Sequence, residues 1–141
     1  MDEVIIERLT PELAAAFPPC AGQVFDDDPS SQHLEKLALM PGHALFVARN
    51  RGLVVGQLLA MTQFQADRPP QLYIDNLGVA PDFKRKGIAR SLFDAAMAWG
   101  KDNGCDGVWL ATDVGNAEAR GFYNAFGFTR EPADVYMGKL G

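Results

Sequence analysis

Hydrophobic residues along the chain fall into short runs separated by turn-forming residues, and these runs predict β-strands. Residues 43–49 and 53–61 flank the short turn Asn-Arg-Gly, which predicts an antiparallel hairpin. The other runs of this kind are residues 4–9, 71–79, 107–112 and 134–140, the last of which predicts a closing strand.

Two short helices are predicted in the first 40 residues. The first has Thr10 as its N-cap and a proline in the tolerated first turn, and the two prolines at 18–19 interrupt it. The second follows a loop rich in Asp, Pro and Ser. It is capped by Ser30 or Ser31 and ends at Leu39.

Helical spacing of apolar residues predicts two further helices. One covers residues 87–103, with Gly104 as a C-terminal cap, and the other begins with Asn116 as its N-cap. The apolar positions are Ile88, Leu92, Ala95, Ala96 and Trp99 in the first helix, and Ala119, Phe122, Tyr123 and Phe126 in the second. We expect each set to be buried on one face of its helix.

The order of these elements predicts the fold class. A strand, a helix and a strand in succession normally place the two strands parallel, whereas the hairpin before them is antiparallel. The expected product is an α/β fold, which some schemes class as α+β. It would have a mixed sheet of six to seven strands and about four helices on both faces. The sequence shows no repeat or linker, so residues 1–141 are predicted to form a single domain.

The composition is that of a globular protein and narrows the classes of partner. The chain of 141 residues is 48% hydrophobic and 22% charged, with a formal net charge of -5. This acidity argues against nucleic acid as the main partner and suits a cationic small molecule, although solubility alone also explains it. No apolar run approaches the ~20 residues that span a bilayer. We expect a cytoplasmic protein with no membrane contact.

Cysteine and histidine give no sign of a metal site. Cys20 and Cys105 are far apart and lack a CxxC pattern, which favours two free thiols. The spacing of His33 and His43 does not fit a metal pair, and both are interpreted as surface residues.

A cationic cluster interrupts this acidic chain between a predicted strand and a predicted helix. Lys84, Arg85, Lys86 and Arg90 surround a Gly-Ile-Ala step. The first N–H groups of a helix lack internal partners and bind phosphate well where small residues allow close approach. Neither the Walker pattern nor the dinucleotide fingerprint is present. A solvated cluster is the alternative, although cations are disfavoured at a helix N-terminus.

Two motifs of this chain resemble those of the GCN5-related N-acetyltransferases (GNAT). The stretch LGVAPDFKRKGIARSLF, residues 77–93, is similar to the acetyl-CoA-binding segment of that family, written [QR]-x-x-G-x-[GA]. Here the pattern is filled by Lys84, Arg85, Lys86, Gly87, Ile88 and Ala89, with Lys in place of the usual Gln or Arg. NAEARGFYNAFGF, residues 116–128, fits N-x-x-A-x-x-[LF]-Y-x-x-x-G-F at each named position.

The resemblance implies acetyl-CoA as co-substrate and assigns residues to it. The pyrophosphate would rest on backbone N–H groups of residues 85–90, that is Arg85, Lys86, Gly87, Ile88, Ala89 and Arg90, with Lys84 beside them. The pantetheine arm would pair with Leu77, Gly78 and Val79, and the thioester carbonyl would meet an N–H near Leu77. The strands ending near Val79 and Thr112 would splay apart. Asn116 would contact the cofactor, serve as a plain N-cap, or do both.

The resemblance also implies the chemistry of catalysis. Tyr123 would protonate the leaving thiolate, although periodicity alone makes it a packing residue beside Phe122. Asp75 is a candidate base or amine anchor, and Asp113 is the other carboxylate nearby. Strand alternation places Tyr73, Asp75 and Leu77 on one face, and a bulge before Leu77 would reverse that phase.

Two segments of the chain bear on the identity of the amine acceptor. Asp26, Asp27 and Asp28 would attract a cation, or form a solvated loop. The stretch DRPPQLYIDNLGVAP is also similar to that of aminoglycoside 3-N-acetyltransferases and their unassigned relatives, which often carry Asp at the position of Asn76.

These observations predict an N-acetyltransferase that moves acetyl from acetyl-CoA to a primary amine of a small cationic molecule. Transfer is expected to be direct, in a ternary complex, because no nucleophile is placed for an acyl-enzyme. Two alternatives stay open: acetylation of a protein lysine or N-terminal amine, and an acyl-CoA-binding module without turnover. A homodimer paired through residues 134–140 is open as well.

Overall fold

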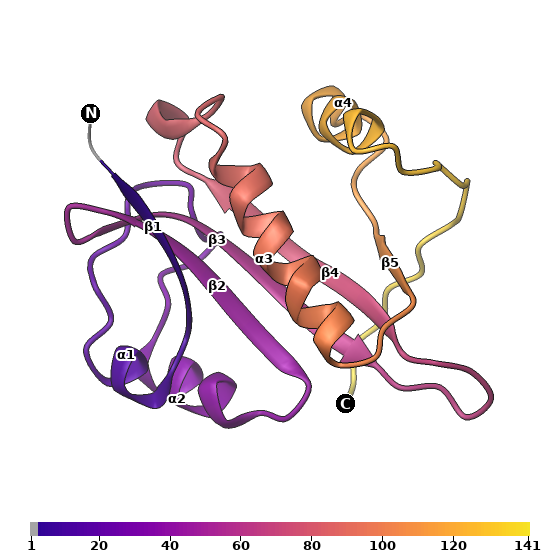
Figure 1. The fold of residues 1–141 in the computed structure, drawn as a ribbon, viewed down its shortest axis with the longest axis horizontal. Coiled ribbons are helices and arrows are strands. Elements are labelled where there is room, and N and C mark those ends of the chain that lie inside the picture. The colour runs from indigo at the N-terminus through magenta and orange to yellow at the C-terminus, as the bar shows by residue number, and fades with distance from the viewer. Residues whose placement is uncertain (1–2) are drawn as a thin grey trace. The chain divides into compact units, whose positions relative to one another are not determined.

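The structure is a computed structural model that describes residues 3–141 (Figure 1). The chain forms two compact units, one ending at Leu110 and the other running from Ala111 to Gly141.

The first unit contains a five-stranded sheet in the order β1-β2-β3-β4-β5. Its strands are β1 (Val4–Arg8), β2 (His43–Asn50), β3 (Leu53–Gln63), β4 (Gln71–Val79) and β5 (Gly107–Leu110). All neighbours are antiparallel except β4 and β5, which are parallel. The hairpin and the parallel pair of strands are confirmed, and the mixed sheet is that of an α/β fold.

The α-helices lie where the sequence predicts them, whereas a short 3-10 turn before the third of them was not predicted. They are α1 (Pro11–Ala15), α2 (Ser31–Leu39), the 3-10 turn η1 (Pro81–Phe83), α3 (Ile88–Asp102) and α4 (Ala117–Ala125). Ser30 is the cap of α2 and accepts from the backbone N–H of His33 at 3.1 Å. Gly104 follows α3 with φ +84°, the conformation in which glycine ends helices most easily. Among the described residues, none of these helices has the length and apolarity needed to cross a membrane.

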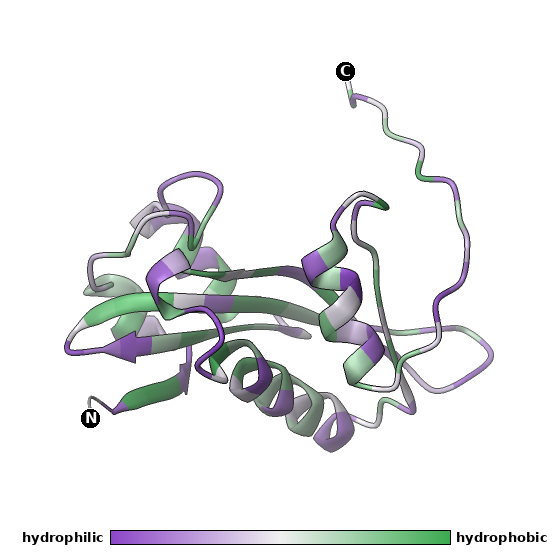
Figure 2. Cartoon of the chain, turned by 90° about the horizontal axis from the view of Figure 1, so that it is seen from above, coloured by the Kyte–Doolittle hydropathy of each residue, from purple (hydrophilic) through white to green (hydrophobic). Residues whose placement is uncertain are grey.

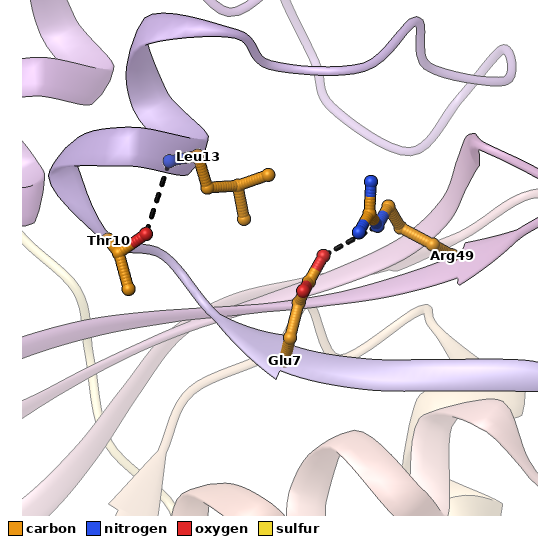
Figure 3. Close-up of polar contacts among 4 residues, drawn as sticks. All are labelled: Glu7, Thr10, Leu13 and Arg49. Atoms are coloured by element: carbon orange, nitrogen blue, oxygen red, sulfur yellow. Dashed lines mark hydrogen bonds and ion pairs between the residues drawn. The ribbon is translucent and has the colours of Figure 1, made fainter.

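Two polar contacts secure the start of the chain (Figure 3). The Thr10 hydroxyl accepts a hydrogen bond from the backbone N–H of Leu13 at 3.1 Å, which caps α1 as predicted. Glu7 on β1 and Arg49 on β2 form a cross-strand ion pair.

Helices cover both faces of the sheet. Phe46 on β2 packs edge-to-face against Trp99 of α3. Leu45, its neighbour, points the other way and joins a core with Ala14 of α1 and Leu34 of α2, because successive side chains of a strand alternate. Hydrophobic residues accordingly concentrate along the strands, as Figure 2 shows.

The second unit corrects two predictions. Residues 129–141 form no strand, so the sheet has five strands rather than six or seven. A strand needs a neighbour for its backbone groups, and this unit supplies none. Val135, Tyr136, Met137 and Leu140 are accordingly exposed, at 74–105%. On α4, the predicted apolar positions are half-buried rather than buried.

Candidate active site

β4 continues beyond its parallel neighbour and leaves an open backbone edge. The two strands pair only over Gln71–Ile74 and Gly107–Leu110 within the chain that the structure describes. β5 ends at Leu110 rather than at Thr112. β4 runs on beyond Ile74, and its residues 76–79 are paired with β3. All four residues of β5 are paired, so the pairing stops because β5 ends, and the parting of strands that reach Val79 and Thr112 stays a prediction.

The hydrogen-bond pattern shows which backbone groups face this edge. The N–H of Ala80 donates to the carbonyl of Val55 at 2.9 Å, on the β3 side. In an antiparallel ladder, hydrogen-bonded and non-hydrogen-bonded pairs alternate. Gly78 therefore bonds toward β3 like Ala80, whereas Leu77 and Val79 turn their N–H and C=O groups to the open edge.

A loop between α1 and α2 crosses directly over Gly78. A Cβ atom at this position would collide with the carbonyl oxygen of Val24. The buried side chain of Gln57 holds the crossing, because its Nε2 donates to that same oxygen at 3.1 Å and to Oδ1 of Asn76 at 2.6 Å. Sequence reasoning missed Gln57, whose one signal is a lone amide inside a hydrophobic strand.

We expect Gly78→Ala to lower the free energy of unfolding by about 1–3 kcal/mol, because the new methyl group must displace the Val24 carbonyl. Urea denaturation measures the change. Gly22→Ala, in the same loop but with open space around it, should stay within about 0.5 kcal/mol of wild type. Equal stability of the two variants would contradict the close crossing.

The cationic cluster lies at the N-terminus of α3, as predicted. Gly87 is the N-cap, with φ +79°, and has no side chain to occupy the first N–H groups. The first turn carries no acidic residue. Lys84, Arg85 and Lys86 are exposed, and the Lys86 ammonium lies 5.1 Å from the ring centroid of Phe83. This end of α3 can therefore receive a multiply charged anion.

A β-bulge at Asp75 sets the faces of β4. Leu59 pairs with Asn76 and Ala60 with Ile74, so Asp75 is the extra residue. Strict alternation is therefore wrong here, and the bulge alternative is right: Tyr73 and Asn76 share a face, and Leu77 lies on the other. Tyr73 donates a hydrogen bond to the exposed Asp75 carboxylate. Burial, followed by the charge and hydrogen bond of Asp75, raises the pKa of Tyr73.

Two predicted site residues lie in the second unit. Asn116 is the N-cap of α4 and accepts from the backbone N–H of Ala119 at 3.0 Å. Tyr123 is half-buried beside Phe122 and stacks on Phe128, with ring centroids 6.4 Å apart. Burial raises the pKa of its hydroxyl, so the phenol is protonated at neutral pH.

Neither of the two cysteines is activated as a nucleophile. Burial raises the pKa of both free thiols, with Asp28 adding to the effect at Cys20 and Asp106 at Cys105. Asp26, Asp27 and Asp28 are exposed. Within residues 3–141, no group of three His, Cys, Asp or Glu residues could hold a metal ion.

Comparisons with known proteins match most of the chain. The model of the acetyltransferase (GNAT) family matches residues 6–128. An aminoglycoside N(6')-acetyltransferase type 1 of Salmonella typhimurium is 24% identical over 124 residues, which are 83% of this chain and 86% of that protein. N-alpha-acetyltransferase 30 of Schizosaccharomyces pombe is 28% identical over 85 residues, 60% of this chain and 57% of that protein.

Solved structures with the same fold include aminoglycoside acetyltransferases. The aminoglycoside N-acetyltransferase AAC(6')-Iy in complex with CoA has a TM-score of 0.81 at 21% identity, and the match covers 99% of this chain and 96% of that one. An aminoglycoside acetyltransferase from an uncultured soil metagenomic sample, in complex with sisomicin, has a TM-score of 0.79 at 25% identity. That match covers 97% of this chain and 95% of the other.

Proposed function

The chain belongs to the acetyltransferase (GNAT) family, and we propose that it transfers acetyl directly from acetyl-CoA to a primary amine of a small cationic molecule. One observation carries the proposal: the open edge of β4, onto which Leu77 and Val79 turn their backbone groups. The family match spans the boundary between the two units, which supports a single catalytic domain over residues 1–141.

The residues present fit acetyl-CoA as co-substrate. An extended amide-containing arm pairs with a free strand edge as another strand does, and residues 77–79 offer such an edge. The N-terminus of α3 offers N–H groups and the cationic side chains of residues 84–90 for a pyrophosphate. We assign Asn116 to the same group, with its capping role retained.

Three groups of this chain would perform the chemistry on the activated acetyl group that the thioester supplies. The N–H of Leu77 donates to the reacting carbonyl oxygen, a contribution worth about 3 kcal/mol where such donors have been removed. Asp75 holds the incoming ammonium and takes a proton from it. Tyr123, protonated at neutral pH, gives a proton to the departing sulfur.

Direct transfer is supported by the state of the two cysteines. An acyl-enzyme on cysteine needs an activated thiolate, and such thiols have a lowered pKa. Here burial raises the pKa of both Cys20 and Cys105. Neither thiol is prepared to carry an acetyl group.

The acceptor assignment is supported by charge and by two relatives. A net charge of -5 favours cationic substrates. The similar proteins include aminoglycoside acetyltransferases, one of them solved with sisomicin. The similarity to N-alpha-acetyltransferase 30 favours a second candidate, in which a protein amine is the acceptor.

The test is thiol release from acetyl-CoA with a panel of amines: aminoglycosides, polyamines, amino acids and short lysine peptides. We expect turnover on the small cationic amines. Turnover on peptides alone would establish the second candidate. Tight binding of acetyl-CoA with no turnover on any amine would instead indicate a binding module.

A further inference from the structure

An aromatic pair occupies the face of the sheet opposite α3, near the parallel strands. Tyr73 on β4 is in register with Trp109 on β5, and their ring centroids lie 4.4 Å apart at an interplanar angle of 33°. The preceding residue Leu72 packs against Gly100 of α3, so Tyr73 points to the other face. Trp109 remains 47% exposed although it lies within a strand.

Polar contacts fix both rings in place. The indole N–H of Trp109 donates to Oε1 of Gln63 on β3 at 2.8 Å. The hydroxyl of Tyr73 donates to the carboxylate of Asp75. An exposed ring that is held at its polar atom presents an ordered apolar surface, unlike a mobile surface side chain.

Asp75 places a negative charge at the border of this surface. As the bulge residue, it stands where pairing with β5 has ended and the open edge of β4 begins. A carboxylate accepts about four hydrogen bonds, and Tyr73 uses one of these positions. The exposed oxygens of Asp75 are thus available to a donor that lies against the rings.

We propose that Tyr73, Trp109 and Asp75 form an acceptor platform that selects a primary ammonium group carried on a saturated ring. The rings receive the apolar side of the acceptor, and the ammonium is attracted by the carboxylate and the aromatic faces. This inference rests on the proposed function, since it places the amine beside the edge assigned to the thioester. The negative charge of Asp75 at the border of the platform excludes anionic acceptors.

Trp109 emission tests the platform without any turnover. In the Trp99→Phe variant, Trp109 is the sole tryptophan, and cyclohexylmethylamine is titrated against its neutral counterpart cyclohexylmethanol. We expect the amine to change the emission and to bind at least about tenfold more tightly than the alcohol. If Trp99→Phe fails to fold, the difference between wild type and Trp109→Phe gives the same signal.

Two charge variants test whether the preference for the amine comes from Asp75 itself or from the overall negative charge of the protein. Asp75→Asn should abolish the preference for the amine, whereas Asp67→Asn, at an exposed carboxylate in the loop between β3 and β4, should retain it. Equal binding of amine and alcohol would overturn the platform. So would equal behaviour of the two variants, or an emission change that follows protein concentration alone, which would indicate a second copy on this face.

Failure of the acceptor platform can be distinguished from failure of the proposed function. Binding of the amine at Trp109 with no acetyl transfer would retain the platform and reject the reaction. Acetyl transfer with a KM for cyclohexylmethylamine that is unchanged in Trp109→Leu would retain the reaction and reject the platform. If both inferences hold, Trp109→Leu raises that KM about tenfold and leaves kcat near the wild-type value.

Discussion

Tyr123→Phe is expected to lower kcat at least about 100-fold and to leave the KM for acetyl-CoA nearly unchanged. The substitution removes one hydroxyl and keeps the ring that packs beside Phe122 and Phe128. The departing thiolate then has no acid to protonate it. Initial rates of thiol release with the best amine of the panel measure the effect.

Tyr136→Phe is the matched control, because it removes a hydroxyl from a side chain that is 90% exposed. It should keep the wild-type rate. Because burial raises the pKa of Tyr123, the phenol is protonated at neutral pH and its titration should cause no loss of kcat there. A Tyr123→Phe enzyme with the wild-type rate would return this residue to a packing role.

Arg85→Gln combined with Lys86→Gln should raise the KM for acetyl-CoA by about 10- to 100-fold, with little change in kcat. Hydrogen bonds to charged groups contribute about 1.5–3 kcal/mol each, and about 1.4 kcal/mol corresponds to a factor of ten. Both side chains are exposed at the N-terminus of α3, where the pyrophosphate is assigned. The effect should diminish as salt concentration rises.

The control is Lys36→Gln combined with Lys101→Gln. It removes the same number of positive charges, but from the C-terminal ends of helices rather than from the start of α3. Both lysines lie in the last turn of their helices, α2 and α3. We expect this pair to leave the KM for acetyl-CoA within about twofold of wild type. Equal rises of KM in the two double variants would mean that overall charge, rather than the start of α3, attracts the co-substrate.

Local signals in the sequence predicted most of the fold. Thr10 and Ser30 cap helices because their hydroxyls reach N–H groups only three residues away. The Asn-Arg-Gly turn and the spacing of apolar residues from Ile88 onward are equally local. The cationic loop was found for the same reason, since its strand, glycine and helix are contiguous in the chain.

Features that depend on contacts between distant segments could not be settled from the sequence. The bulge at Asp75 is a property of the pairing with β3, so the sequence left it as one of two alternatives for the faces of β4, and the structure decided between them. Gly78 is required by the carbonyl of Val24, and Gln57 joins that loop to Asn76 across the strands. Residues 134–140 have the composition of a strand, but composition supplies no neighbour to pair with.

The measurement that tests the acetyl-CoA site most directly is residue-resolved amide hydrogen exchange by NMR, with and without CoA. We predict slower exchange at Leu77 and Val79, whose N–H groups face the open edge of β4, and in the first turn of α3 from Ile88 to Arg90. The amide of Gly78 should hardly change, because it already bonds toward β3. Binding of CoA that protects neither the β4 edge nor the start of α3 would contradict this assignment of the site.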